Sequence, residues 1–202
     1  TSGIGSLSKQ IEGHDLVVVV GAPVFRYYPW IAGEYIPAGS TLLHISDDPN
    51  STSKAVVGDS LVSDSKLFFS EALKGLKEKK NQQVPKRTVM GKEDRAAIPM
   101  LPHAVLEVLQ ENSPKDIVLV EECPSIVPLM QDVFRINAPD TYYTFASGCL
   151  GWGLPASVGL ALGEVKSGRN RPVISLMGDG SFQYSIQAIY TGVQQKAHVI
   201  YV

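Results

Sequence analysis

Short runs of consecutive apolar residues, many of them β-branched, recur along the 202-residue chain between segments with a helical spacing of apolar positions. Such runs are typical of strands buried on both faces of a parallel sheet. A further strand is expected within residues 55–62, where Gly58 and Asp59 interrupt the apolar run. The clearest strands are predicted at residues 15–20, 41–46, 117–120, 142–145, 173–177 and 198–202.

The segments between these runs predict helices. One is expected to run from a cap at Asp64 or Ser65 to about Gly75. Its apolar positions fall on one face and are Leu67, Phe68, Ala72 and Leu76. A helix over residues 102–110 is expected to bury Val105, Leu106 and Leu109. Further helices are predicted at residues 126–134, 154–162 and 182–195.

Strands that alternate with helices indicate the α/β fold class with parallel sheets. We expect two doubly wound parallel-sheet units, residues 1–80 and residues 98–202, joined by a polar linker over residues 81–97. The chain lacks an initial Met and stops inside the apolar run 198–202. Because such a strand normally leads into a loop and helix, the second unit is expected to be truncated at its C-terminus, and the sequence to be a piece of a larger chain cut at both ends.

Composition and charge narrow the classes of function. The formal net charge is -2 and the pI about 6.1, without a basic stripe, so no nucleic acid partner is expected. The first residues lack the charged start and apolar core of a signal peptide, and no apolar run of about eighteen residues occurs, which predicts a cytoplasmic protein with no membrane partner. Cys123 and Cys149 have neither CxxC spacing nor paired zinc-type histidines, and are expected to be reduced.

The tetrapeptide Gly178-Asp179-Gly180-Ser181 directly follows the apolar strand at 173–177. Open α/β sheets bind ligands at the carboxyl ends of their strands. Glycines allow backbone N–H groups to approach an anion, and the start of a helix adds partial positive charge. Mg²⁺ is commonly held by one or two carboxylates together with phosphate oxygens. The tetrapeptide therefore predicts a Mg²⁺–diphosphate site with Asp179 as the metal ligand.

Two further strand ends are expected near this site. The segment 121–125 (EECPS) follows one predicted strand, and the glycine cluster 148–153 (GCLGWG) follows the short strand 142–145. Parallel strands end at the same edge of a sheet, so all three segments can converge on one ligand. Neither glycine cluster has the G-x-G-x-x-G spacing of a dinucleotide-binding loop, and the chain has no Walker lysine motif or G-x-S-x-G elbow.

These segments resemble the thiamine-diphosphate-dependent enzymes of the 2-oxo-acid decarboxylase and acetohydroxyacid synthase superfamily, and within it the benzoylformate decarboxylases. Residues 21–27 (GAPVFRY), followed by DDP at 47–49 and GD at 58–59, are similar to the central domain of that family. Residues 142–155 (YYTFASGCLGWGLP), followed by GDGS at 178–181, are similar to its diphosphate-binding domain. The likeness covers nearly the whole chain, with the motifs in the same order.

The resemblance implies a role for each matching position. Asp179 would bind Mg²⁺ and bridge it to the diphosphate of thiamine diphosphate, and Ser125 would contact the terminal phosphate. The carbonyl of Gly148 would accept from the aminopyrimidine ring, and Leu150 would be the wedge that bends the cofactor into a V-shape. The remaining diphosphate contacts would come from Gly178, Gly180 and Ser181.

The resemblance also implies which groups lie outside this segment. In the family a second metal ligand follows the next strand, and the glutamate that protonates the aminopyrimidine lies in a preceding domain. No catalytic residue is therefore expected here, and the segment alone is expected to be inactive. The parent protein would take a small-molecule 2-oxo acid and would form a homodimer or homotetramer with active sites between subunits. Structural or surface roles are predicted for His14, His44, His103 and His198.

Three other functions remain open. An acetohydroxyacid-synthase-like carboligase of the same superfamily would differ in the residues of its substrate pocket. A phosphoryl-transfer enzyme would use Asp179 as the nucleophile, although the second acid of a D-x-D motif is absent. A non-catalytic nucleotide- or diphosphate-binding module would hold its ligand within residues 14–76, although only Gly21 stands where a glycine-rich loop is needed.

Overall fold

The computed structural model describes residues 4–24, 32–77, 91 and 93–202. The chain divides into two compact units, Thr1–Pro85 and Lys86–Val202. Most of the predicted linker at residues 81–97, and part of the GAPVFRY segment, lie outside the described residues. Both units are α/β, with parallel sheets and helices, which confirms the predicted fold class.

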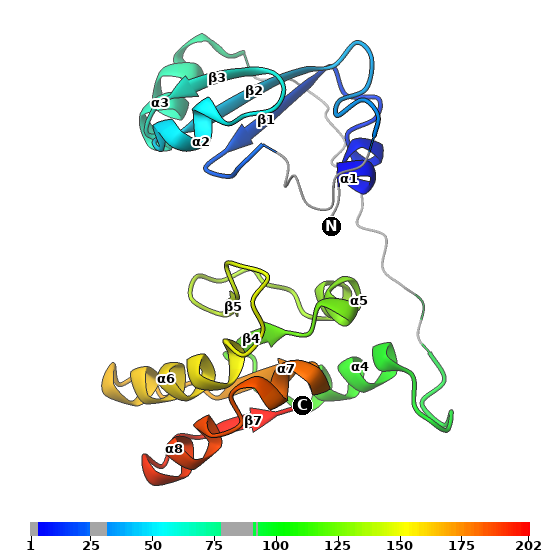
Figure 1. Cartoon of the computed structure of the whole chain (residues 1–202), viewed down its shortest axis with the longest axis vertical. Helices are drawn as coiled ribbons and strands as arrows, with labels where there is room; N and C mark the ends of the chain where they lie inside the picture. The colour runs from blue at the N-terminus through cyan, green and yellow to red at the C-terminus, as the bar shows by residue number, and fades with distance from the viewer. Residues whose placement is uncertain (1–3, 25–31, 78–90, 92) are drawn as a thin grey trace. The chain divides into compact units, whose positions relative to one another are not determined.

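The first unit contains a parallel sheet in the order β1-β2-β3 (Figure 1). Two of its strands match the apolar runs, and the third begins only after the positive-φ residue Gly58. The strands are β1 (Leu16–Val20), β2 (Thr41–Ser46) and β3 (Asp59–Val62). The helices are α1 (Ile4–Gln10), α2 (Pro49–Ser53) and α3 (Ser65–Gly75).

The side chains of two aspartates cap the N-termini of α2 and α3. The Asp48 carboxylate accepts a hydrogen bond from the Asn50 amide at 2.9 Å, at the start of α2. The Asp64 carboxylate accepts from the Leu67 amide, also at 2.9 Å, at the start of α3. Side-chain caps of this kind satisfy N–H groups that have no partner within the helix.

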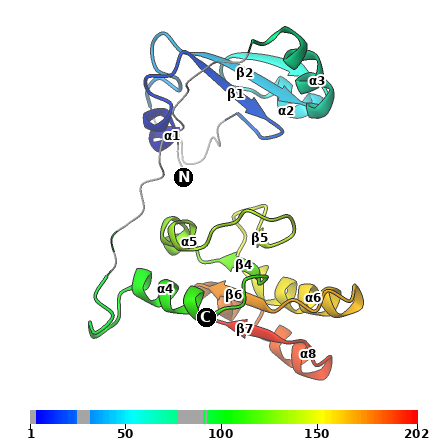
Figure 2. The ribbon, with the colours of Figure 1, turned by 180° about the vertical axis from the view of Figure 1, so that it is seen from behind.

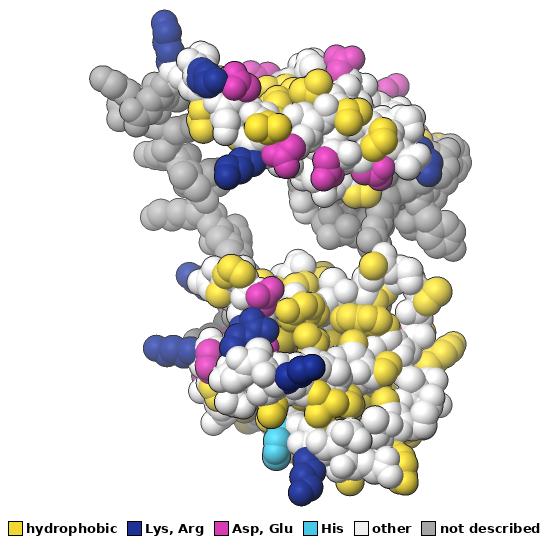
Figure 3. Space-filling view, turned by 90° about the vertical axis from the view of Figure 1, so that its left-hand side faces the viewer, with side chains coloured by type: hydrophobic (Ala, Val, Ile, Leu, Met, Phe, Trp, Pro, Cys, Tyr) yellow, Lys and Arg dark blue, Asp and Glu magenta, His cyan; other side chains and the backbone are white. Residues whose placement is uncertain are grey.

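The four apolar positions predicted to share one face of α3 are only partly covered within this unit, where Phe68 and Ala72 are half-buried. Leu67 and Leu76 are 65% and 69% exposed, and no residue of α3 is fully buried. Apolar side chains of the sheet are exposed as well, among them Leu16 and Val62. The described residues of the first unit therefore expose apolar side chains of both α3 and the sheet. Hydrophobic side chains are visible on the surface of each unit (Figure 3).

The second unit contains a four-stranded parallel sheet in the order β5-β4-β6-β7. Its strands are β4 (Val118–Glu122), β5 (Tyr142–Thr144), β6 (Val173–Met177) and β7 (Val199–Tyr201). Its helices are α4 (Pro102–Asn112), the 3₁₀ turn η1 (Pro124–Ile126), α5 (Val127–Val133), α6 (Gly153–Lys166), α7 (Asp179–Tyr184) and α8 (Ala188–Gln194).

The second unit is built in three layers, with helices on both faces of the sheet (Figure 1, Figure 2). Alternate residues of a strand point to opposite faces. Leu119 of β4 packs in a cluster with residues of α4 and α5, whereas Val118 and Val120 pack with Ala161 of α6. None of the helices in the described part of the chain has the length and apolar character needed to cross a membrane.

Two sequence expectations about helices in this unit are wrong. The single helix predicted at 182–195 is two helices, because Ser185 leaves the helical conformation at φ -142° and its hydroxyl donates to the carbonyl of Gly151 at 2.6 Å. In α4, Val105 is 37% exposed, while His103 is buried and its Nε2 lies 3.2 Å from Asp132 of α5. Leu106 is buried as predicted and Leu109 packs against the same core, so the error is confined to Val105, and His103 joins the inward face through its contact with Asp132.

Candidate functional site

A topological switch point lies between β4 and β6. The chain passes from β4 to β5 on one side, then crosses to β6 on the other side of β4. The connections that leave the two central strands therefore diverge, and open α/β sheets bind their ligands in the crevice that this leaves at the carboxyl ends. In this unit the corresponding position lies beyond Glu122 of β4 and Met177 of β6.

The segments that follow these two strands lie side by side. The amide of Gly178 donates to the carbonyl oxygen of Glu122 at 3.0 Å. A Cβ placed on Gly178 would lie 3.6 Å from Ser181 Oγ and 3.9 Å from Cys123 Sγ. Cys123 Sγ in turn lies 3.7 Å from Ser125 Oγ. The predicted diphosphate residues at the two strand ends are therefore neighbours in space.

Asp179 is the first residue of α7 and its side chain is exposed at this edge. Among the residues that the structure describes, no group of three or more His, Cys, Asp or Glu side chains is placed to hold a metal ion. Asp179 can therefore contribute one carboxylate to a metal site, and the other ligands must come from elsewhere.

The glycine segment 148–153 is brought to the same edge. A Cβ on Gly153 would lie 2.7 Å from the sulfur of Met177, the last residue of β6. Gly148 is exposed, a Cβ there would meet nothing within 4 Å, and the Leu150 side chain is 39% exposed. The two predicted cofactor residues of this segment therefore have open space beside them.

Glu122 is a residue of this site to which the sequence analysis assigned no role. Its side chain is completely buried, and its two carboxylate oxygens accept from the amides of Gly151 and Gly153. The strand was predicted to end at Val120, but the structure continues it through Glu122. The sequence signal for this role was the position of Glu121 and Glu122 directly after an apolar strand. A carboxylate buried at such a strand end needs hydrogen-bond partners.

The neighbouring Glu121 faces the opposite side of β4 and belongs to a different network. Its carboxylate accepts from Thr144 Oγ1 at 2.9 Å, from the Tyr142 hydroxyl at 3.2 Å and from the Cys123 amide at 2.6 Å. Burial raises the pKa of Tyr142, and the negative charge of Glu121 raises it further. Glu121 therefore holds β5 against β4 and shapes the turn that leads to Ser125.

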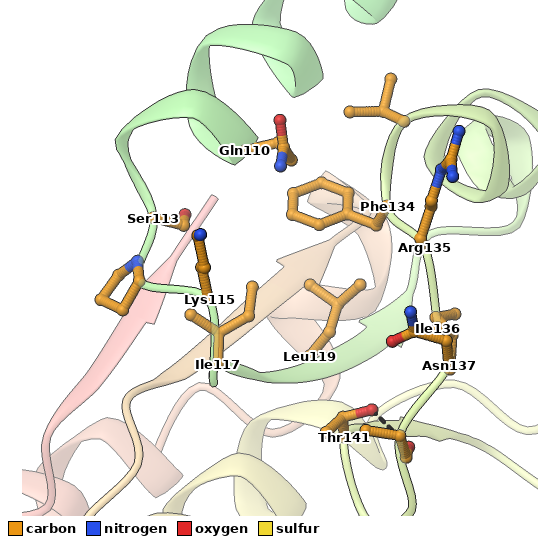
Figure 4. A pocket seen from close by; sticks show the side chains of 13 residues that line it. Gln110, Ser113, Lys115, Ile117, Leu119, Phe134, Arg135, Ile136, Asn137 and Thr141 are labelled. Atoms are coloured by element: carbon orange, nitrogen blue, oxygen red, sulfur yellow. Dashed lines mark hydrogen bonds between the residues drawn. The ribbon is translucent and has the colours of Figure 1, made fainter. Parts of the chain in front are cut away.

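Among the described residues, neither of two cavities, one in each unit, is lined by Asp179. One, of about 470 Å³, opens at the amino ends of β4 and β5, and the apolar side chains of Ile117, Leu119 and Phe134 face into it (Figure 4). The other, of about 430 Å³, lies in the first unit beside Val24 and Asp48, beyond the carboxyl ends of β1 and β2. The position of the second is the one at which an α/β unit would hold a nucleotide.

The four histidines are placed as expected, in structural or surface positions. His44 and His103 are buried in the core of their units, whereas His14 and His198 are exposed. None of them lies in the segments at the carboxyl ends of β4 and β6.

Comparisons with known proteins agree with this geometry. Residues 126–202 match the family described as thiamine pyrophosphate enzyme, C-terminal TPP binding domain. The crystal structure of benzoylformate decarboxylase from Polynucleobacter necessarius is 78% identical with a TM-score of 0.94, and the match covers 100% of this chain and 38% of that one. Benzoylformate decarboxylase of Pseudomonas aeruginosa is 33% identical over 204 residues, which cover 100% of this chain and 37% of that protein.

The acetolactate synthase large subunit of Buchnera aphidicola is 26% identical over 179 residues, which cover 83% of this chain and 30% of that protein. The matches thus cover between 30% and 38% of the length of these relatives. The family match covers the glycine segment 148–153 and the segment 178–181 of the second unit. The segment 178–181 begins directly after β6, at the switch point of the sheet. Residues 126–202 accordingly match the thiamine-pyrophosphate-binding domain of this enzyme family, and the chain resembles the benzoylformate decarboxylases along its whole length.

Proposed function

We propose that the protein containing this chain is a thiamine-diphosphate- and Mg²⁺-dependent decarboxylase that converts a 2-oxo acid, benzoylformate or a close analogue, into an aldehyde and carbon dioxide. The observation that carries the proposal is the meeting of Cys123–Ser125 with Gly178–Ser181 at the switch point of the second unit. The similarity to benzoylformate decarboxylases over the whole chain supports the choice of substrate class.

In this proposal the residues of the two strand ends hold the diphosphate and its metal. Asp179 binds Mg²⁺, and the backbone of Gly178 and Gly180 together with the hydroxyl of Ser181 contacts the diphosphate. Ser125 contacts the terminal phosphate from the end of β4. The exposure of Asp179 and the proximity of Ser181 to Gly178 support this assignment.

The glycine segment holds the rings of the cofactor. The carbonyl of Gly148 would accept from the aminopyrimidine, and the side chain of Leu150 would be the apolar wedge against which the cofactor packs. When bound, thiamine diphosphate supplies the electron sink that allows a 2-oxo acid to lose carbon dioxide. The residues of this chain bind and orient the cofactor, and the proton-transfer groups come from outside residues 1–202, so the segment alone is inactive.

A second candidate is a carboligase of the acetolactate synthase type, favoured by the 26% identity to that large subunit. Both reactions begin with loss of carbon dioxide from a 2-oxo acid, and they differ in whether a proton or a second carbonyl compound is then accepted. The residues that make this choice line the substrate pocket. In either case, we propose a homodimer or homotetramer with active sites between subunits.

A non-catalytic nucleotide- or diphosphate-binding module is a third candidate. The cavity beside Val24 and Asp48 in the first unit favours it, since it lies at the strand ends of a parallel sheet. Only Gly21 stands where a phosphate-binding loop would be, so a nucleotide would find few backbone N–H groups there.

The test begins with the intact gene product purified from its native source. Its mass is measured first, and the protein is then assayed with thiamine diphosphate and Mg²⁺ in two reactions: benzoylformate to benzaldehyde, and pyruvate to acetolactate. Benzaldehyde formation that requires both cofactors is the expected result. Acetolactate formation would support the carboligase instead. A native mass of 21.8 kDa without any binding of thiamine diphosphate would overturn both reactions and favour the binding module.

A further inference from the structure

Glu122 ends the central strand β4 with its side chain completely buried. Both carboxylate oxygens are used: Oε1 accepts from the amide of Gly151, and Oε2 accepts from the amide of Gly153. None of the ion pairs formed by the described residues includes Glu122. A buried carboxylate needs compensating partners, and here backbone N–H groups provide them.

These amides lie at the beginning of α6, which starts at Gly153 and runs for 14 residues. The residue before it, Trp152, makes no side-chain capping bond. The first N–H groups of a helix have no partner within the helix, and its N-terminus carries partial positive charge. Glu122 therefore caps α6 from a neighbouring strand, and the helix in turn stabilises the buried negative charge.

The segment is held from its other side as well. Gly151 has φ +98°, a backbone conformation that side-chain-bearing residues rarely adopt, and its carbonyl accepts from Ser185 Oγ at 2.6 Å. Gly153 has no room for a side chain, because a Cβ would lie 2.8 Å from Glu122 Oε2. Residues 151–153 are thus held by hydrogen bonds to Glu122 of β4 and to Ser185 in the turn after α7.

Glu122 also binds the Gly178 amide through its own backbone carbonyl, at 3.0 Å. One residue therefore ties the glycine segment 148–153 and the beginning of the segment 178–181 to the same strand end. We propose that Glu122 is a positioning residue whose carboxylate holds residues 148–153 in the conformation that presents Gly148 and Leu150 to the cofactor. This inference rests on the proposed function, since it assumes that the cofactor binds there.

The substitution Glu122→Gln isolates the role of the second carboxylate oxygen. A glutamine side chain has almost the same volume, but it offers one acceptor oxygen and one NH₂ donor. The NH₂ group would face the N–H of either Gly151 or Gly153, so one hydrogen bond is lost and two donors oppose each other. The segment is expected to loosen while the core around it stays filled.

Glu164→Gln is the matched control. Glu164 is also buried, at 2% exposure, and lies in α6, the helix that Glu122 caps. Its carboxylate, however, accepts hydrogen bonds from Arg171, beyond the C-terminal end of that helix. Both variants change one buried carboxylate to an amide and both are expected to lower the unfolding temperature. Only the Glu122 change touches the glycine segment.

The experiment uses the intact gene product and the two variants. Hydrogen exchange is measured for the amides of Gly151 and Gly153 without cofactor, and thiamine diphosphate affinity is measured by calorimetry in excess Mg²⁺. Glu122→Gln is expected to speed the exchange of these amides at least about tenfold and to weaken thiamine diphosphate binding about tenfold, the loss of roughly one hydrogen bond to a charged group. Glu164→Gln is expected to change both by less than about twofold.

The outcomes separate this inference from the proposed function. Failure of the unsubstituted protein to bind thiamine diphosphate would overturn the proposed function together with the cofactor part of the inference. Normal binding by the unsubstituted protein, with unchanged exchange and affinity in Glu122→Gln, would overturn the inference alone. Equal loss of affinity in Glu164→Gln would also overturn it. If Glu122→Gln does not fold, Glu122→Asp, which keeps the charge but shortens the reach, is expected to show the same loss of protection and affinity; wild-type values in it would overturn the inference.

Discussion

The carbonyl oxygen of Glu122 and the amide nitrogen of Gly178 lie 3.0 Å apart and join the ends of the two central strands of the second unit by a hydrogen bond. Asp179 follows directly, at the start of α7. The predicted metal ligand is therefore anchored to the sheet through its preceding residue, while its own carboxylate remains exposed. Four predictions follow from contacts of this kind in the two units.

Asp179→Asn is expected to weaken Mg²⁺-dependent binding of thiamine diphosphate by about a hundredfold or more, because the carboxylate at the predicted metal position loses its charge. The measurement is calorimetric titration of the intact gene product with thiamine diphosphate in the presence of Mg²⁺. Asp116→Asn is the control, since Asp116 is an exposed acid two residues before β4, at the opposite end of that strand. Equal affinities in the two variants would contradict the assignment of Asp179.

Gly153→Ala is expected to lower the free energy of unfolding by about 1–3 kcal/mol, because the new methyl group would lie 2.7 Å from Met177 Sδ. The control is Gly159→Ala in the same helix, where a Cβ would meet nothing within 4 Å. There alanine is expected to stabilise the protein by roughly 0.5–1 kcal/mol, since it replaces glycine inside a helix. Denaturant unfolding measures both, and changes of the same sign would disprove the packing argument.

Glu164 is expected to make the fold sensitive to acid. The hydrogen bonds from Arg171, helped by the charges of Arg171 and Arg169, hold the pKa of Glu164 below its ordinary value of 4.5 although burial opposes this. A carboxyl whose pKa is lowered by folding stabilises the folded state above its unfolded pKa, and this contribution is lost as the pH falls through its folded pKa.

The difference in unfolding free energy between the unsubstituted protein and Glu164→Gln is therefore expected to be constant near neutral pH and to shrink as the pH falls below 4.5. Denaturant unfolding at a series of pH values between about 7 and 3 measures this difference. A difference that does not vary with pH would show that the ion pair contributes nothing through its charge.

Asp64→Ala is expected to destabilise the first unit by about 1 kcal/mol, because it removes the acceptor of the Leu67 amide at the start of α3. Asp64→Asn is the conservative control and is expected to keep most of the stability, since asparagine caps helices about as well as aspartate. Thermal or denaturant unfolding measures both variants. A loss as large in Asp64→Asn as in Asp64→Ala would mean that the charge, and not the cap, matters.

Most strands of both units could be predicted because they are largely runs of apolar residues of strand length, and 41–46 and 173–177 match the observed strands residue by residue. The position of Asp179 followed from the same reasoning, since a residue after a buried parallel strand lies at the ligand-binding edge. The exposed apolar face of α3 could not be foreseen, because helical spacing shows which residues share a face but not what covers it.

Sequence alone therefore determined the α/β class, the positions of the strands and the strand end at which Asp179 lies, because these depend on local runs of apolar residues and on the residues that directly follow them. Tertiary structure decided what Glu122 does. Its partners Gly151 and Gly153 are 29 and 31 residues away along the chain, and only the pairing of β4 with its neighbours and the packing of α6 bring them to its carboxylate. A contact between residues so far apart depends on the whole sheet and its covering helix, and no local pattern encodes it.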